Sequence, residues 1–141
     1  MSSDDTQSPP PTTLVGGKYE VLGLIGRGGM GSVYEGRHTS LGTPCAIKFI
    51  DAEYANSQDA RSRFDMEARA AASIQSKHAI QIYDHGVTAD GRPYIVMERL
   101  LGEPLDQRIK REGTISLLET ARIMRQVARA LSRAIRHKDC Y

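Results

Sequence analysis

The pattern of apolar and polar residues predicts several short strands before any long helix. Short apolar segments rich in Val, Ile and Tyr are separated by Gly, Pro and Asp, which is typical of strands joined by turns. The Asp90-Gly91 pair, between the last two segments, is a strong hairpin signal. The predicted strands are Tyr19–Leu22, Ser32–Arg37, Pro44–Ile50, Ile80–Val87 and Arg92–Glu98.

Helical spacing of apolar residues appears in three places. Within Asp59–Ile74, apolar side chains recur every three or four residues, and the segment is rich in Ala, Arg and Glu. A short helix over Leu105–Glu112 ends at Gly113, and Ser116 with Glu119 predicts a capping box at the start of a last helix. The apolar face of that last helix is Leu117, Ala121, Met124, Ala128, Leu131 and Ile135.

The order of these elements predicts an α+β fold. Five strands with one helix between the third and the fourth, joined by hairpin-like links, favour an antiparallel sheet over a doubly wound one. The polar segment 1–17 contains Pro9-Pro10-Pro11 and has little to bury, so we expect a disordered tail there. Residues 18–141 then form one domain or a lobe of a larger one.

Composition and charge exclude several classes of protein. The chain has 141 residues, of which 40% are hydrophobic and 26% charged, and a net charge of +2 with interleaved signs, so we expect no nucleic-acid surface. Cys45 and Cys140 are far apart and match no metal spacing, which favours a cytoplasmic location. No apolar stretch approaches the roughly 20 residues of a membrane span, so we expect no membrane segment in this chain.

A glycine cluster carries the first candidate chemistry. Residues 26–33, Gly-Arg-Gly-Gly-Met-Gly-Ser-Val, fit G-x-G-x-x-G-x-V, in which backbone amides can approach phosphate oxygens. A P-loop would need a lysine where Ser32 stands. A dinucleotide-binding loop would need a helix after Gly31, although Asp51 lies at a suitable distance for its acid. The alternation after Gly31 favours a strand, and hence a loop that folds over a nucleotide.

Lys48 and Glu67 are the second candidate feature. Lys48 interrupts an otherwise apolar strand, where a charge is costly unless it is paired. Glu67 lies at helical spacing from Phe64, Ala71 and Ile74, so we expect it to face the sheet with them. The alternatives are an edge-strand lysine directed to water and a glutamate at the rim of the helix face. An ion pair between the two explains both positions.

These motifs together resemble the N-terminal part of the protein kinase family, over residues 19–131. The stretch LIGRGGMGSVYEG is similar to the bacterial serine/threonine branch. The resemblance implies that ATP is bound and that its γ-phosphoryl group passes to a Ser or Thr hydroxyl with the help of Mg²⁺. It implies catalytic roles for Lys48 and Glu67. The implied nucleotide contacts are Ile25, Gly26, Gly28, Gly29, Gly31, Val33, Ala46, Lys48, Met97, Glu98 and Leu100.

By the same resemblance, residues 18–97 are the N-lobe, 98–104 the hinge and 105–141 the start of the C-lobe. Met97 corresponds to the gatekeeper, and the backbone of Glu98 and Leu100 to the groups that bind adenine. The chain departs from the family near its end, where His137-Lys138-Asp139 resembles H-R-D but comes about four residues early, and no D-F-G follows. Asp139 is therefore a weak candidate for the base, no metal ligand is assigned, and we expect a fragment that lacks the catalytic loop.

Two other classes of function stay open. One is a non-catalytic nucleotide-binding or interaction module, such as a split or decoy kinase fragment. The other is an NAD-type binding domain, which the strand pattern after Gly31 disfavours. The protein substrate is not indicated by the sequence.

Overall fold

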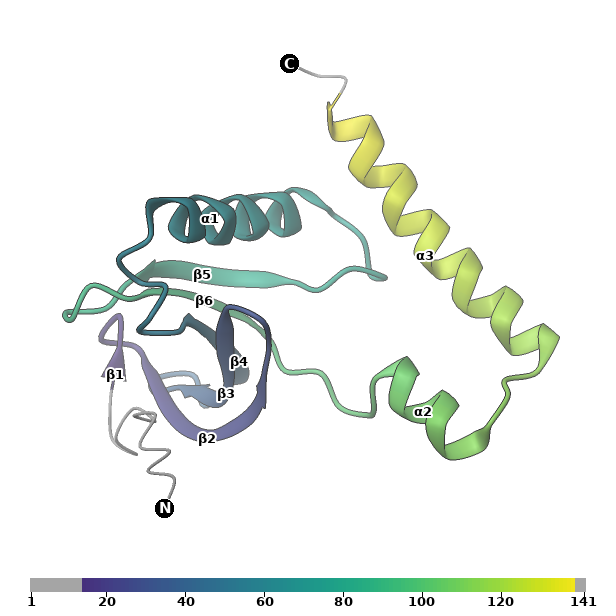
Figure 1. Ribbon diagram of the computed structural model, residues 1–141, viewed down its shortest axis with the longest axis horizontal. Helices are drawn as coiled ribbons and strands as arrows, with labels where there is room; N and C mark the ends of the chain where they lie inside the picture. Colours follow the sequence, from purple (N-terminus) through teal and green to yellow (C-terminus); the bar gives the residue numbers. More distant parts are fainter. Residues whose placement is uncertain (1–13, 139–141) are drawn as a thin grey trace. The chain divides into compact units, whose positions relative to one another are not determined.

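The computed structural model describes residues 14–138, and within them it contains nine helices and strands. Figure 1 shows their course. The chain divides into two compact units. The first holds all strands and α1 up to Ala68, and the second holds the rest of α1 with the segment to Gln81 and everything from Leu100 onward. In chain order the elements are β1 (Leu14–Val15), β2 (Tyr19–Arg27), β3 (Gly31–His38), β4 (Pro44–Ile50), α1 (Gln58–Ser73), β5 (Ile82–Val87), β6 (Pro93–Glu98), α2 (Leu105–Glu112) and α3 (Leu117–Lys138).

The first unit is built on one antiparallel sheet with the strand order β1-β2-β3-β4-β6-β5. Every neighbouring pair of strands is antiparallel. The predicted α+β fold with an antiparallel sheet and one helix among the strands is confirmed. The chain then adds two further helices, α2 and α3, as the sequence indicated.

Two predictions are wrong at the start of the sheet. The tail does not extend to residue 17, and the sheet has six strands, not five. Leu14 and Val15 form a sixth strand, β1, which pairs with Glu20 and Tyr19 of β2. Val15 is only 1% exposed and belongs to the core. A strand of two residues is too short to show an alternating pattern, so the sequence carried no visible signal for it. Residues 1–13 lie outside the described part of the chain.

The alternation of side chains along β4 separates two apolar clusters. Cys45, Ile47 and Phe49 belong to a cluster on one face of the curled sheet, together with residues of β1, β2, β3 and β6. Ile50 belongs to a second cluster on the other face, where α1 packs. Burial of each large apolar side chain of this kind contributes roughly 1.5–3 kcal/mol. The other buried members of this second cluster are Ala55, which precedes α1, then Ala60, Phe64 and Ala68 of α1, and Ile95 of β6.

The second unit contains two helices with well-defined ends. Gly113 ends α2 with a positive φ of 82°, and its N–H donates to the Ile109 carbonyl at 2.8 Å. Ser116 caps α3 as predicted, because its hydroxyl accepts the N–H of Glu119 at 3.3 Å. The reciprocal half of the predicted capping box is absent, since the Glu119 carboxylate pairs with Arg108 at 2.7 Å.

The apolar face of α3 is exposed within the described chain. Side chains along it range from 43% exposure at Val127 to 86% at Leu117. Exposed apolar faces of this size are typical of surfaces that meet another protein segment. The largest side chains on this face are Leu117, Met124, Val127, Leu131 and Ile135.

Candidate functional site

The glycine cluster forms the turn of a β-hairpin. Arg27 of β2 is opposite Ser32 of β3, and the Gly28 N–H donates to the Gly31 carbonyl at 2.8 Å. The chain continues after Gly31 as β3, antiparallel to β2. A dinucleotide-binding loop would be followed by a helix at this point. The structure therefore excludes the NAD-type reading of this motif and agrees with a glycine-rich strand-turn-strand loop.

The structural requirement for glycine differs between the positions of this turn. None has a positive φ, so the backbone conformation does not demand glycine. At Gly31 a Cβ atom would overlap the backbone carbonyl of Phe49, so packing against β4 requires a glycine there. A Cβ at Gly26 or Gly29 would meet nothing within 4 Å. The space beside the α-carbons of these two residues is therefore open.

Lys48 and Glu67 form the ion pair that the sequence predicts. Lys48 Nζ lies 2.7 Å from Glu67 Oε1 and 5.9 Å from the centre of the Phe64 ring. The Lys48 side chain is 24% exposed and that of Glu67 is 55% exposed. Glu67 is thus less buried than its helical spacing suggested, and the pair lies at the open edge of the α1 interface. A lysine held in this way keeps further N–H donors for an anionic ligand.

Several other predicted site residues share a face of the sheet with Lys48. Val33 of β3 is directly opposite Lys48, and Ile95 of β6 is opposite it on the other side. Ala46 is opposite Met97, two positions along both strands from the Lys48–Ile95 pair. Since side chains two residues apart in a strand lie on the same face, the register brings Val33, Ala46, Lys48 and Met97 together.

The remaining predicted contacts are placed individually. Ile25 is 43% exposed and lies at an irregularity of the β2–β3 register, between the Leu24 and Gly26 pairings. Glu98 ends β6 opposite Cys45. Leu100 belongs to the second unit and is 60% exposed. Asp139, the weak candidate base, lies outside the described residues.

Metal ligands and membrane segments were also sought among the described residues. Over residues 14–138, no three His, Cys, Asp or Glu side chains come together in a way that could hold a metal ion. The structure therefore assigns no residue to Mg²⁺. In the same part of the chain, no helix has the length and apolar character needed to cross a membrane.

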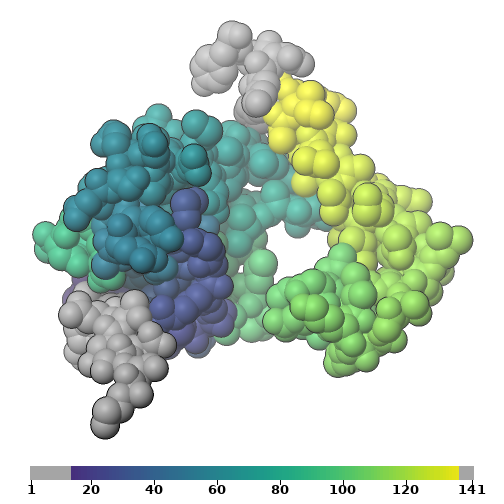
Figure 2. All heavy atoms as spheres, viewed as in Figure 1, coloured from purple at the N-terminus to yellow at the C-terminus, as the bar shows by residue number. Residues whose placement is uncertain are grey.

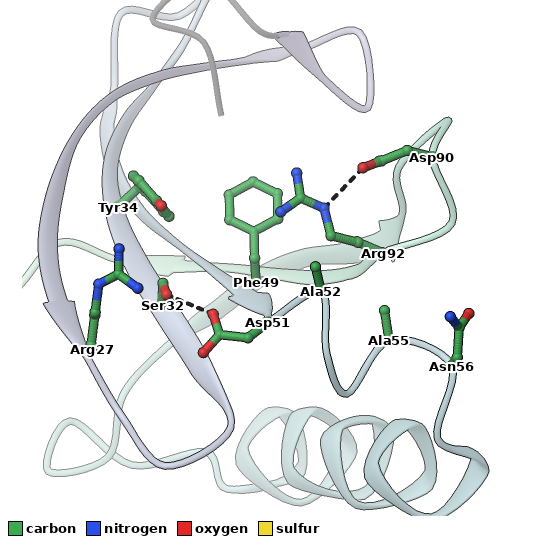
Figure 3. Close-up of a pocket in the computed structure, with 10 residues that line it drawn as sticks. All are labelled: Arg27, Ser32, Tyr34, Phe49, Asp51, Ala52, Ala55, Asn56, Asp90 and Arg92. Carbon is green, nitrogen blue, oxygen red and sulfur yellow. Dashed lines mark hydrogen bonds and ion pairs between the residues drawn. The ribbon is translucent and has the colours of Figure 1, made fainter. Parts of the chain in front are cut away.

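A separate pocket of about 340 Å³ lies on the opposite face of β4 (Figure 3). Tyr34 and Phe49 contribute its apolar wall. At its edge the Ser32 hydroxyl donates to Asp51 Oδ1 at 2.7 Å, which gives Asp51 a partner within the chain. Arg92 stacks over Phe49 at 5.6 Å. Sequence reasoning missed this pocket; the only available signal was that Ser32 and Tyr34 alternate with the predicted site residue Val33 on one strand.

Polar contacts at the rim of this pocket fix its charged groups. Arg92 Nε lies 2.9 Å from Asp90 Oδ2. The hydrogen bond from the Thr88 hydroxyl, and then the charge of Arg92, hold the pKa of Asp90 below its ordinary value, although burial opposes them. Asp90 therefore becomes protonated at a lower pH than a free aspartate does, and the β5–β6 turn keeps its ion pair to that lower pH.

The chain is similar to known bacterial kinases along most of its length. It is 37% identical to the probable serine/threonine-protein kinase PknB of Bifidobacterium longum, with 92% of this chain and 20% of that protein covered. It is 36% identical to the serine/threonine-protein kinase PknH of Mycobacterium tuberculosis, with 87% of this chain and 20% of that protein covered. The chain thus spans about a fifth of the length of these relatives.

Solved structures and a family model agree with these relatives. The crystal structure of the Mycobacterium tuberculosis PknI kinase domain matches with a TM-score of 0.77 and 26% identity, over 91% of this chain and 52% of that one. The model of the protein kinase domain matches residues 19–140, which include the glycine turn, Lys48, Glu67 and β6. The chain therefore belongs to the protein kinase family, as a segment from the N-terminal region of its kinase domain.

Proposed function

We propose that this chain is the ATP-binding portion of a serine/threonine protein kinase. The observation that carries the proposal is the 2.7 Å ion pair between Lys48 and Glu67, on the same sheet face as Val33, whose pairing partner Gly26 belongs to the glycine turn. A nucleotide needs a cationic group for its phosphates and an apolar wall for its base. Both requirements are met on this face by residues from three adjacent strands.

Each residue has a distinct role in this proposal. Lys48 donates to the α- and β-phosphates, and Glu67 holds its ammonium group in position. The amides of Gly26 and Gly29 approach the phosphates from the turn, Gly28 closes the turn through its bond to the Gly31 carbonyl, and Gly31 keeps the turn close to β4. The adenine ring is sandwiched by apolar side chains and hydrogen-bonded by the backbone. The residues proposed for the adenine are Ile25, Val33, Ala46, Met97, Glu98 and Leu100.

We keep the proposed division into N-lobe, hinge and C-lobe, with residues 98–104 as the hinge. In the whole kinase, the γ-phosphoryl group of ATP would pass to a protein Ser or Thr hydroxyl. Positioning and charge stabilisation supply most of the catalysis in such a reaction. Mg²⁺ would neutralise phosphate charge there, and no described residue of this chain is proposed as its ligand.

A second candidate is a non-catalytic nucleotide-binding module. One observation on the C-terminal end of α3 favours it. His137 and Lys138 continue α3, whereas the family motif they resemble would have to lie in a loop. The two candidates share nucleotide binding and differ in phosphoryl transfer. We expect the 141-residue polypeptide to bind ATP without transferring its phosphate.

Titration and a transfer assay test the proposal together. Calorimetry should detect binding of ATP and none of NAD⁺ at the same concentrations, because β3 follows the glycine turn where a dinucleotide site has a helix. Preference for NAD⁺, or failure to bind either ligand by a folded chain, would refute the proposal. Radiolabel transfer from ATP to a Ser/Thr substrate, lost in Lys48→Met, would show that the polypeptide is catalytic and would remove the second candidate.

A further inference from the structure

The second unit carries a groove whose charged residues are all cationic. It has a volume of about 780 Å³ and runs between the C-terminal part of α3, yellow in Figure 2, and the segment that follows α1. None of its lining residues belongs to the proposed nucleotide site. The groove is lined by Ser76, Lys77, His78, Arg125, Ala128, Arg129, Ser132, Arg133 and Arg136.

The arginines of α3 are concentrated on one side of the helix. Arg125, Arg129, Arg133 and Arg136 follow one another at spacings of four, four and three residues, which places them on one helix face. Like charges at such spacings destabilise a helix by roughly 0.2–0.5 kcal/mol per pair. The apolar face of α3 lies beside this row of arginines, and Ala128 belongs both to that face and to the groove lining. The arrangement therefore opposes helix stability, and an anionic ligand would reverse that effect.

Carboxylates within the second unit do not neutralise these arginines. Among the described residues of that unit, every acidic side chain pairs with a cation of α2 instead. Glu103 pairs with Arg111, and the cations Arg108 and Lys110 take the others. The acids engaged in this way are Glu103, Asp106, Glu112 and Glu119.

The neighbouring segment provides polar groups beside the cations. Arg133 donates to the Gln75 carbonyl, which ties the segment to α3. His78 Nε2 is shielded from solvent and has no hydrogen-bond partner among the described residues. Ser76 is 6% exposed, and its hydroxyl accepts the backbone N–H of His78 at 3.2 Å. A ligand in the groove would meet guanidinium groups on one side and an imidazole and a hydroxyl on the other.

We propose that this groove binds a phosphorylated segment of a protein. Guanidinium groups match phosphate oxygens in a two-pronged geometry, and the groove offers four of them with one lysine. No aromatic ring lines the groove apart from the imidazole of His78, so it lacks the stacking platforms that single-stranded nucleic acids use. Its concave form sets Ser76 and His78 beside the arginines, and vesicles of anionic lipid are kept as the competing ligand in the experiment.

The test uses the 141-residue chain and a fluorescein-labelled peptide carrying two phosphoserines, with its unphosphorylated twin. Fluorescence anisotropy should show binding of the phosphorylated peptide alone. The double variant Arg125→Gln, Arg129→Gln should weaken that binding by at least about tenfold, because two charge-assisted contacts are removed. Arg122→Gln is the matched control, since Arg122 is on the same helix but outside the groove lining, and it should change the affinity less than about twofold.

Three outcomes would overturn the proposal. Equal binding of the two peptides would show that phosphate is not recognised. Equal losses in Arg122→Gln and in the double variant would show general charge attraction without a groove. Tighter binding of an oligothymidylate or of vesicles containing phosphatidylserine than of the phosphopeptide would assign the surface to another class of ligand. Circular dichroism and an unchanged ATP affinity confirm that each variant is folded.

Discussion

The two substitutions Gly31→Ala and Gly29→Ala should separate folding from nucleotide binding within one turn. Both glycines have ordinary negative φ values, so the backbone can accept alanine at either position. At Gly31 the added methyl group would overlap the Phe49 carbonyl oxygen and lie 3.4 Å from its carbon. At Gly29 the methyl group would meet nothing within 4 Å.

The expected magnitudes follow from these surroundings. The carbonyl that Gly31→Ala meets belongs to the backbone of β4, which cannot rotate away as a side chain would. Overpacking of this kind costs about 1–3 kcal/mol, a substantial part of the 5–15 kcal/mol that stabilises a typical domain. Gly29→Ala should leave the free energy of unfolding unchanged or raise it by about 0.4–1 kcal/mol, because alanine restricts the unfolded chain.

The two variants should rank differently in ATP affinity than in stability. If the turn covers the phosphates, a methyl group at Gly29 enters the space that the ligand needs, so Gly29→Ala should weaken ATP binding in a fully stable protein. Urea unfolding followed by circular dichroism gives the stability, and calorimetry at a temperature where both variants are folded gives the affinity. The reasoning is refuted if Gly31→Ala is as stable as the wild type, or if Gly29→Ala binds ATP with unchanged affinity.

Three further predictions concern the cap of α3, the buried Tyr94 and the exposed apolar face of α3. Ser116→Ala should lower the free energy of unfolding by about 1 kcal/mol through loss of the α3 cap, whereas Ser132→Ala, within the same helix, should not lower it; equal effects in urea titrations would contradict the capping role. Burial, and then the Asp84 charge, raise the pKa of Tyr94 above its ordinary value of 10.0, so the contribution of neutral Tyr94 to stability is complete below pH 10 and is lost as pH rises further. The urea midpoint should therefore fall less steeply above pH 10 in Tyr94→Phe than in the wild type. Parallel curves for the two proteins would contradict this prediction. The exposed face of α3 should make the isolated polypeptide self-associate, and Leu131→Glu should reduce the association seen by light scattering; a clean monomer at high concentration would show that this face is closed in solution.

The features that were predictable from sequence are those with a local signal. Lys48 stands out because one charge interrupts an apolar strand, and Glu67 because it shares helical spacing with Phe64. The alternation after Gly31 correctly indicated β3 and so excluded a dinucleotide loop. Each of these inferences depends on a pattern within a few residues, and strand and helix periodicities fix such patterns directly.

The features that were missed depend on contacts between distant segments. The pairing of β1 with β2 involves two residues, and Val15 is recognisable as a core residue only when the other strands surround it. The hydrogen bond between Ser32 of β3 and Asp51, which follows the end of β4, joins residues 19 positions apart. The cationic groove needs the segment around His78 to lie beside α3, which no periodicity along the chain could indicate.

The central claim, that Lys48 binds the phosphates of ATP, is tested most directly by calorimetric titration of ATP into the wild type, Lys48→Met and Lys18→Met. Lys18 is the matched control, because it is also a lysine of the first unit paired with a carboxylate, at 3.5 Å from Asp84. Loss of a charge-assisted contact of roughly 1.5–3 kcal/mol should weaken ATP binding at least about tenfold in Lys48→Met, while Lys18→Met should bind as the wild type does. Unchanged affinity in a folded Lys48→Met variant would contradict the account.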